Sequence, residues 1–116
     1  MGNGKKYDGM DPADGVEMKL RYDLIPPEIL EHLARIYTHG AKKYGENQWQ
    51  EVDPFYNRYY AAAERHIQDD RKGETVDPLS GELHLAHAFW NIGALLWKRI
   101  KEQGEGTDET NSQISR

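Results

Sequence analysis

The sequence contains no cysteine in its 116 residues. This absence excludes disulfide bonds, zinc sites built on thiolates, and thiol nucleophiles. The sequence also has no apolar run approaching roughly 18 residues, the length that suggests a transmembrane helix, and no apolar segment typical of a signal peptide. We therefore predict no interaction with a membrane and expect a cytoplasmic protein.

Blocks of basic residues are also absent. Lys and Arg number 15 against 20 Asp and Glu, which gives a formal net charge of -5. Proteins that grip a nucleic-acid backbone need a basic surface, so we expect no nucleic acid polymer as a partner. Strand signals are missing too, because β-branched residues are few and never alternate over a useful length. Composition and length together predict one all-α domain.

Pro and Gly residues mark the starts and ends of three main helices, which we expect to form a compact bundle. We predict the first over 27–44, the second from about Phe55 to Lys72, and the third from Ser80 or Gly81 to Gln103, where Ser80 caps its start and Gly104 ends it. The domain is expected to cover 19–103. It would lie between a mobile N-terminal arm over 1–18 and a disordered tail over 104–116.

Apolar residues at helical spacing predict the sides that are buried. For the first helix they are Ile29, Leu33, Ile36, Tyr37, Ala41 and Tyr44, and for the second they are Phe55, Tyr59, Ala62, Ala63 and His66. The third helix is apolar almost all the way round, which two other helices cannot cover. Exposed Phe89, Trp90, Leu96 and Trp97 would form a large apolar patch, so we expect a homo-oligomer, either a dimer or a tetramer.

The exceptions on the third helix are His84, His87 and Asn91, which fall on one face. Buried imidazole and amide groups need hydrogen-bond or metal partners. His66 and Asp69 lie on the core side of the second helix, and Glu74 and Asp77 lie in the loop between these helices. Such a set can hold a divalent ion. The alternative is a closed structural hydrogen-bond network, with the aspartate at a frayed helix end and Asp77 in an ordinary turn.

Three segments carry a resemblance to a known family. They are KLRYDLIPPEILEHLARIYTHGAKKYGENQW (19–49), RHIQDDRKGETVDPLSG (65–81) and HLAHAFWN (84–91). In this order they resemble the phage-associated dATP/dGTP diphosphohydrolase N-terminal family, which groups with MazZ-like and MazG-like all-α nucleoside triphosphate pyrophosphohydrolases. The resemblance implies hydrolysis of dGTP and/or dATP to the monophosphate and pyrophosphate, in the remodelling of phage nucleotide pools. The location would then be the host cytoplasm.

The resemblance also implies a site that holds Mg²⁺, and a site that contains imidazoles would also accept Mn²⁺. MazG-like enzymes bind magnesium through Glu-x-x-Glu and Glu-x-x-Asp pairs, and this chain departs from them by placing His66, Asp69, His84 and His87 at the positions that best correspond. We interpret four residues as metal ligands: Asp69, Glu74, Asp77 and His84. The candidate catalytic residues are His66, Glu74, His84 and His87. The candidate substrate-binding residues are Lys19, Asp23, Lys43, Tyr44, Asn47, Trp49, Arg65 and Asn91.

Two other classes of function stay open at this point. The chain can be a non-catalytic nucleotide- or partner-binding helical oligomer, in which the polar stripe only locks the interior. It can also be a metal-dependent phosphohydrolase of the His/Asp type that acts on something other than a nucleotide. That reading is weaker, because the adjacent His-Asp pair typical of such enzymes is missing.

Overall fold

The computed structural model describes residues 10–11, 16–17 and 19–110. The three predicted helices are confirmed: α1 spans Pro27–Tyr44, α2 spans Phe55–Arg71 and α3 spans His84–Thr110. Two short 3-10 helices, η1 (Tyr22–Leu24) and η2 (Gln48–Glu51), precede α1 and α2. The bounds of α1 and α2 follow the predicted Pro and Gly signals, because Pro27 occupies the first turn of α1 and Gly73 after α2 adopts a positive φ of 105°.

The prediction that strands are absent is wrong for a small part of the chain. Strands β1 (Met10–Asp11) and β2 (Val16–Glu17) pair in the antiparallel direction. Strands of two residues are too short to give an alternating pattern, so periodicity could not reveal them. The other residues of the predicted arm over 1–18 lie outside the described residues.

Both predicted ends of the third helix are wrong. The hydroxyl of Ser80 accepts a hydrogen bond from the Glu82 backbone N–H inside the preceding loop, so α3 begins only at His84. At the other end α3 passes through Gly104 and reaches Thr110. A single glycine costs a helix only about 1 kcal/mol and does not stop it unless the backbone turns into the left-handed region. The predicted tail therefore overlaps α3 up to Thr110, and 111–116 lie outside the described residues.

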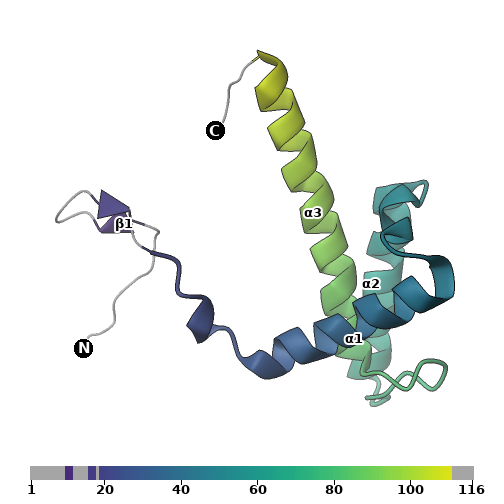
Figure 1. Ribbon diagram of the computed structural model, residues 1–116. Helices are drawn as coiled ribbons and strands as arrows, with labels where there is room; N and C mark the ends of the chain where they lie inside the picture. Colours follow the sequence, from purple (N-terminus) through teal and green to yellow (C-terminus); the bar gives the residue numbers. More distant parts are fainter. Residues whose placement is uncertain (1–9, 12–15, 18, 111–116) are drawn as a thin grey trace.

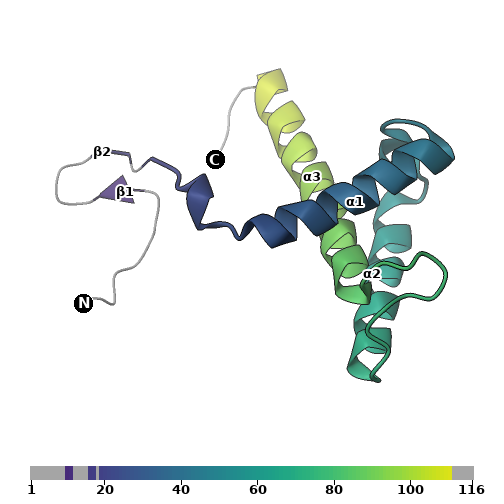
Figure 2. The same ribbon diagram turned by 60° about the horizontal axis from the view of Figure 1, so that its bottom comes forward.

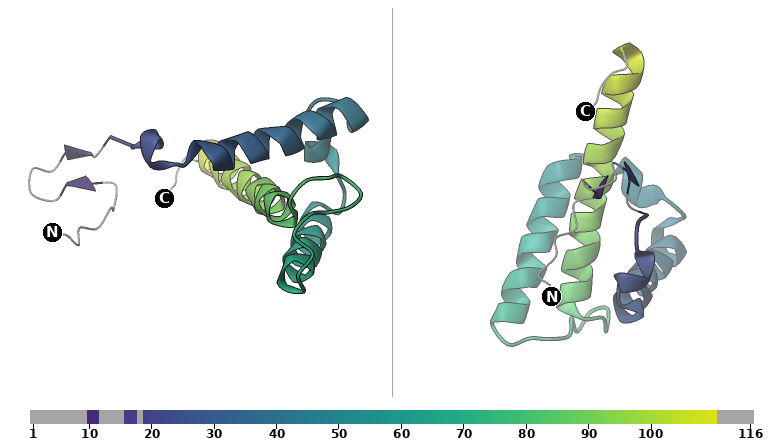
Figure 3. Two further views of the ribbon diagram at one scale, coloured as in Figure 1. Left: turned by 90° about the horizontal axis from the view of Figure 1, so that it is seen from below. Right: turned by 90° about the vertical axis from the view of Figure 1, so that its left-hand side faces the viewer.

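The helices are arranged around α3. Helices α2 and α3 run side by side in opposite directions (Figures 1 and 2). Helix α1 crosses α3 near the lower end of α3 in Figure 1. In the right-hand view of Figure 3, α3 runs between α1 and α2. No helix in the described part of the chain is long and apolar enough to cross a membrane.

An aromatic core packs η2 against α2 and α3. Phe55, Tyr59, Ala94 and Leu95 are buried together, and Trp49 and Trp90 pack edge to face beside them with ring centroids 5.5 Å apart. The Tyr59 hydroxyl donates a hydrogen bond of 2.7 Å to the Trp49 backbone carbonyl. Burial raises the pKa of Tyr59 to about 12, so this hydroxyl keeps its proton at neutral pH. The core thereby fixes the segment between α1 and α2.

The predicted buried side of α1 is largely wrong in a single copy of the chain. No residue of α1 is buried, and Ile29, Tyr37 and Tyr44 are exposed, although Leu33 and Ile36 are half-buried. Periodicity reports that one side of a helix is apolar, but α1 crosses α3 instead of lying along it, so little of that side is covered. The predicted burial and exposure of residues on α2 and α3 are confirmed only in part. Buried Phe55 and exposed Phe89 and Leu96 agree with expectation, whereas Trp90 and Trp97 are half-buried.

Candidate functional site

Three histidines meet where the C-terminal end of α2 lies beside the first turns of α3. The Nδ1 atoms of His66 and His84 are 2.8 Å apart. The rings of His66 and His87 stack with centroids 4.5 Å apart and planes 14° apart. The antiparallel packing of α2 on α3 creates this meeting, because it places the last turns of one helix beside the first turns of the other.

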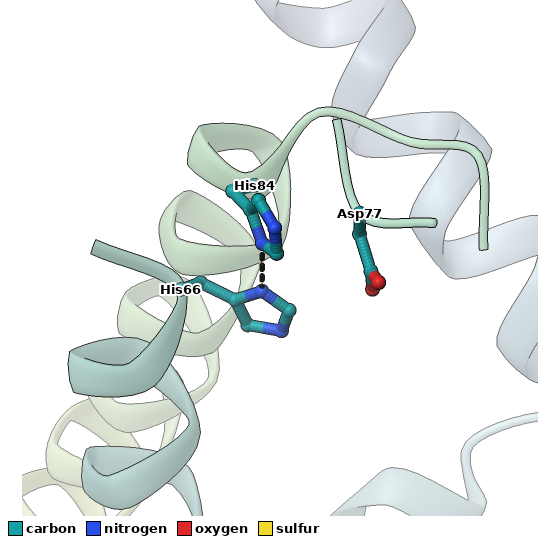
Figure 4. A group of neighbouring side chains, drawn as sticks. All are labelled: His66, Asp77 and His84. Atoms are coloured by element: carbon teal, nitrogen blue, oxygen red, sulfur yellow. Dashed lines mark hydrogen bonds between the residues drawn. The ribbon is translucent and has the colours of Figure 1, made fainter. Parts of the chain in front are cut away.

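Carboxylates from α2 and the α2–α3 loop surround the histidines. His84 is only 2% exposed, and its Nε2 lies 2.8 Å from Glu74 Oε1 and 3.9 Å from Asp69 Oδ2. Asp77 Oδ2 lies 3.7 Å from His87 Nε2. Figure 4 shows His66 on α2, His84 at the start of α3 and Asp77 on the loop, all turned toward the same space. Acids and imidazoles therefore alternate around one small volume.

A hydrogen-bonded chain leads from the loop to α2 through His84. An ionised carboxylate only accepts hydrogen bonds, so the contact with Glu74 requires a proton on His84 Nε2. If His84 is neutral, its Nδ1 carries no proton, and His66 then donates from its own Nδ1 across the contact of 2.8 Å. The arrangement leaves Nε2 of a neutral His66 without a proton, free to accept a proton or to bind a cation.

Two groups of side chains have the spacing of a metal site, and both include His84. One joins His66, Asp77 and His84, and the other joins Asp69, Glu74 and His84, with ligand atoms within 4.8 Å of one another in each group. A neutral imidazole offers one lone pair, so His84 can serve only one of these groups at a time. When His84 binds an ion through Nδ1, it gives up the hydrogen bond from His66, while its Nε2–H remains on Glu74. A carboxylate behind a metal-binding histidine is a common arrangement.

The loop between α2 and α3 is shaped by Asp77. Its carboxylate accepts hydrogen bonds from the Leu79 N–H at 3.0 Å and the Ser80 hydroxyl at 3.3 Å. Burial by itself would raise the pKa of Asp77, but these two hydrogen bonds lower it below its usual value, with a further contribution from His87. Asp77 is therefore ionised at neutral pH, in the form that binds cations. Ser80 also lies 2.8 Å from His87 Nε2 and ties the loop to α3.

Burial keeps two of the histidines neutral. Desolvation lowers the pKa of His66, and repulsion from the other two histidines lowers it further. Desolvation is also the main cause that lowers the pKa of His87, although Asp77 and Glu82 oppose it. Neutral imidazoles are the form that binds metal ions or accepts a proton, so this cluster is suited to both tasks at neutral pH.

A cleft of about 1450 Å³ opens beside the cluster, between the C-terminal half of α1, η2 and one side of α2. His66 and His87 line the cleft, whereas His84, Glu74 and Asp69 do not. Asp77 lines a smaller adjoining pocket with Lys43. The cleft contains most of the predicted substrate-binding residues: Lys43, Tyr44, Asn47, Trp49, Arg65 and Asn91.

Other predicted substrate-binding residues lie elsewhere or have local roles. Neither Lys19 nor Asp23 lines the cleft, and Asp23 forms an ion pair of 2.8 Å with Arg21. Asn91 lines the cleft but uses its amide N–H₂ within α3, where it donates to the His87 carbonyl at 2.8 Å. Trp49 belongs to the aromatic core, so its ring is held in place by packing.

The sequence interpretation missed several residues of the cleft. Arg58 lies two turns before Arg65, and both line the cleft on either side of Ala61 and Ala62. The spacing of seven residues between the two arginines was a signal that could have revealed this row. His39 of α1 contacts buried Glu82 of the loop at 3.2 Å between Nε2 and Oε2, which joins the two walls of the cleft. No local pattern connects these two positions.

Comparison with known proteins gives one family and a relative in a phage. Residues 12–109 match the family described as dATP/dGTP diphosphohydrolase, N-terminal. The chain belongs to this family. It is 32% identical over 79 residues to a protein of Salmonella phage PMBT28 named dATP/dGTP diphosphohydrolase; the match covers 68% of this chain and 27% of the relative. The chain thus spans about a quarter of the length of that relative. No solved structure matches the chain.

Proposed function

We propose that the chain hydrolyses purine deoxynucleoside triphosphates, dGTP and/or dATP, to the monophosphate and pyrophosphate with the help of Mg²⁺ or Mn²⁺. The observation that carries the proposal is the cluster of His66, His84 and Asp77, of which His66 lines a cleft that Lys43, Arg58 and Arg65 also line. Family membership and the name of the phage relative support the choice of substrate. In a phage, the activity would serve the remodelling of the nucleotide pool.

The group of His66, Asp77 and His84 is the better candidate for the metal. His66 lines the cleft and Asp77 lines the adjoining pocket, so an ion there would face the phosphates. Glu74 would then position His84 through the hydrogen bond to Nε2, with Asp69 behind it. The donor set of two imidazoles and one carboxylate fits Mn²⁺ better than Mg²⁺, which prefers oxygen ligands. When bound, the ion would neutralise phosphate charge and acidify a water molecule.

The side chains of the cleft have separate tasks in the reaction. Lys43, Arg58 and Arg65 would bind the phosphates and offset their negative charge. Water attacks the α-phosphorus, the bond to the bridging oxygen breaks, and pyrophosphate leaves with the electron pair of that bond. The proton of the water passes to a neutral imidazole; with His66 bound to the ion, His87 is the histidine of the cluster that lines the cleft and can accept it. The exposed Tyr44 and the amide of Asn47 are available to contact the purine.

The direct test is to incubate the chain with each of the four deoxynucleoside triphosphates and either Mn²⁺ or Mg²⁺. We expect pyrophosphate from dGTP or dATP, and we expect Asp77→Asn and His66→Asn to lose activity by at least about 100-fold, the order found when one group essential to catalysis is removed. Asp70→Asn and His32→Asn are matched controls, because neither residue lines the cleft. Release of orthophosphate instead would indicate a different phosphohydrolase.

A second candidate, a nucleotide-binding module without activity, is favoured by one observation. Many of the polar contacts of the cluster are satisfied within the chain: His84 bonds to Glu74, His87 to Ser80 and Asn91 to the His87 carbonyl. A closed network of this kind can serve packing alone. In that case the same incubation gives nucleotide binding without product, and His66→Asn leaves the affinity unchanged.

A further inference from the structure

A second set of possible ligands meets His84 at its other ring nitrogen. Nε2 of His84 lies 2.8 Å from Glu74 Oε1 and 3.9 Å from Asp69 Oδ2, and none of these three residues lines the cleft or the adjoining pocket. The side chains of Asp69 and Glu74 are 42% and 52% exposed, so an ion can reach them from solvent without entering the cleft. We call these three residues the outer group, and the three residues of Figure 4 the inner group.

The backbone at the end of α2 fixes the outer group. Gly73 follows α2 with a positive φ of 105°, and this reversal lets the Glu74 N–H donate to the Asp69 carbonyl at 3.0 Å. One residue later, the Thr75 carbonyl accepts a hydrogen bond of 2.9 Å from the His84 N–H. The helix cap thus brings Glu74 back to Asp69, and the loop ties both to the start of α3. The outer ligands are therefore held close together before an ion binds.

Charge favours a cation in the outer group. In the described part of the chain, neither Asp69 nor Glu74 forms an ion pair with Lys or Arg. Asp69 also lies in the last turn of α2, at the negative end of the helix dipole. The outer group offers two carboxylates and one imidazole, whereas the inner group offers one carboxylate and two imidazoles. An ion such as Mn²⁺, which favours carboxylate ligands, therefore meets one more negative charge in the outer group.

An ion in the outer group prevents the inner group from binding one. His84 would hold this ion through Nε2, so the proton that Nε2 donates to Glu74 moves to Nδ1. With both histidines neutral, Nδ1 of His66, 2.8 Å away, then accepts from His84, and the proton of His66 moves to its own Nε2. Neither imidazole is left with a lone pair for the inner group. The two groups can therefore hold an ion in turn but not together.

We propose that the outer group is a resting site for a divalent cation, which holds the ion while the cleft is empty and gives it up to the inner group when a nucleotide binds. The phosphates of a nucleotide reverse the order of preference, because His66 and Asp77 line the cleft and its adjoining pocket and Asp69 lines neither. The transfer to the inner group rests on the proposed function. Binding of the ion by the outer group does not.

Titration with Mn²⁺ separates the two groups, because Asp69 belongs only to the outer one and Asp77 only to the inner one. In calorimetry without nucleotide, we expect one Mn²⁺ per chain, bound at least about 10-fold more weakly by Asp69→Asn and with a change of less than about 3-fold in Asp77→Asn. Asp70→Asn alters the next residue of α2, which lies outside both groups, and should bind Mn²⁺ as the wild type does.

Three results of this titration would overturn the proposal: no binding, two ions per chain, or an unchanged affinity in Asp69→Asn. Misfolding is checked by circular dichroism of each variant. In Asp77→Asn the amide oxygen can still accept the loop hydrogen bonds from Leu79 and Ser80, so the loop keeps its contacts.

Binding of a nucleotide analogue tests the transfer of the ion. The probe is dGTP with a methylene group in place of the oxygen between the α- and β-phosphorus atoms. At saturating Mn²⁺, Asp69→Asn should bind it about 3-fold more tightly or better, because the nucleotide no longer has to draw the ion from the outer group. Asp70→Asn should bind it as the wild type does. Weaker or unchanged binding by Asp69→Asn would refute the transfer, and weaker binding would indicate that Asp69 holds the ion that faces the phosphates.

Failure of this proposal and failure of the proposed function give different results. If pyrophosphate is released but Mn²⁺ binding does not depend on Asp69, the outer group is refuted and the hydrolase stands. If Mn²⁺ binds through Asp69 and no nucleotide is hydrolysed, the outer group stands and the hydrolase is refuted.

Discussion

Glu74 allows a quantitative test of the hydrogen-bonded chain that organises the histidine cluster. Glu74→Ala removes the acceptor for His84 Nε2–H, which belongs to a side chain that is 2% exposed. A buried donor without a partner costs about 1 to 3 kcal/mol. The Glu74 side chain is itself 52% exposed and Asp69 Oδ2 is only 3.9 Å from the same nitrogen, so we expect a loss of about 1 kcal/mol in the free energy of unfolding, at the lower end of that range.

Comparison with further variants, including the single variant Asp69→Ala, makes the test specific. Glu74→Gln retains an oxygen acceptor but not the charge, and should lose about half as much, because a charge-assisted hydrogen bond is roughly twice as strong as a neutral one. In Asp69→Ala/Glu74→Ala, the loss should exceed the sum of the two single losses, since each carboxylate can replace the other. Glu64→Ala, an exposed acidic position of α2, is the control and should change stability by less than about 0.5 kcal/mol.

Urea unfolding of metal-free protein, followed by circular dichroism, measures these differences. The reasoning is refuted if Glu74→Ala unfolds at the same urea concentration as Glu64→Ala, or if the double variant is strictly additive. The same variants also separate the possible roles of Glu74 toward a metal. If Glu74 positions His84 behind the ion, Glu74→Ala should weaken Mn²⁺ binding by about 10- to 100-fold in calorimetry, and Glu74→Gln should restore part of that loss.

Three other predictions follow from the same contacts. Metal-free protein should have its full stability above pH 6.5 and lose stability as the pH falls below that value. The reason is that the pKa of His66 and of His87 is lowered in the folded state, so the unfolded chain takes up protons first. A melting temperature that does not change between pH 7.5 and 5.5 would contradict this. Tyr59→Phe should lower the melting temperature by about 4 to 8 °C in thermal unfolding, since it removes a hydrogen bond worth about 1 kcal/mol to the Trp49 carbonyl. Arg65→Ala should raise the KM for the nucleotide by about 10-fold or more in steady-state kinetics, whereas Arg71→Ala, which lies outside the cleft, should leave it unchanged.

The sequence predicted α1 and α2 well because their boundaries are encoded locally. Pro27 at the start of α1 and Gly73 after α2 impose backbone conformations that few other arrangements satisfy. The limits of α3 depend on contacts that are not local. Its start at His84 is set by the loop that Asp77 and Ser80 close, and its end is not set by Gly104, which fits within a helix. Burial along α1 was also unpredictable, because it depends on the angle at which α1 crosses α3.

In the candidate site, too, the features set by local spacing could be predicted, and those set by long-range contacts could not. The spacing of His84, His87 and Asn91 places them on one face of α3 wherever that helix lies, and the loop over 72–83 reverses the chain so that His66 lies beside them. The role of each nitrogen atom could not be predicted, because it depends on Glu74 approaching one side of His84 and His66 the other. With a neutral His84 that donates to Glu74, His66 is the member of the pair whose second nitrogen is unprotonated, and His66 lines the cleft. A reaction that uses the cluster therefore depends on a histidine of α2 and on a supporting carboxylate of the loop, so that the two helices must pack correctly before the site can act.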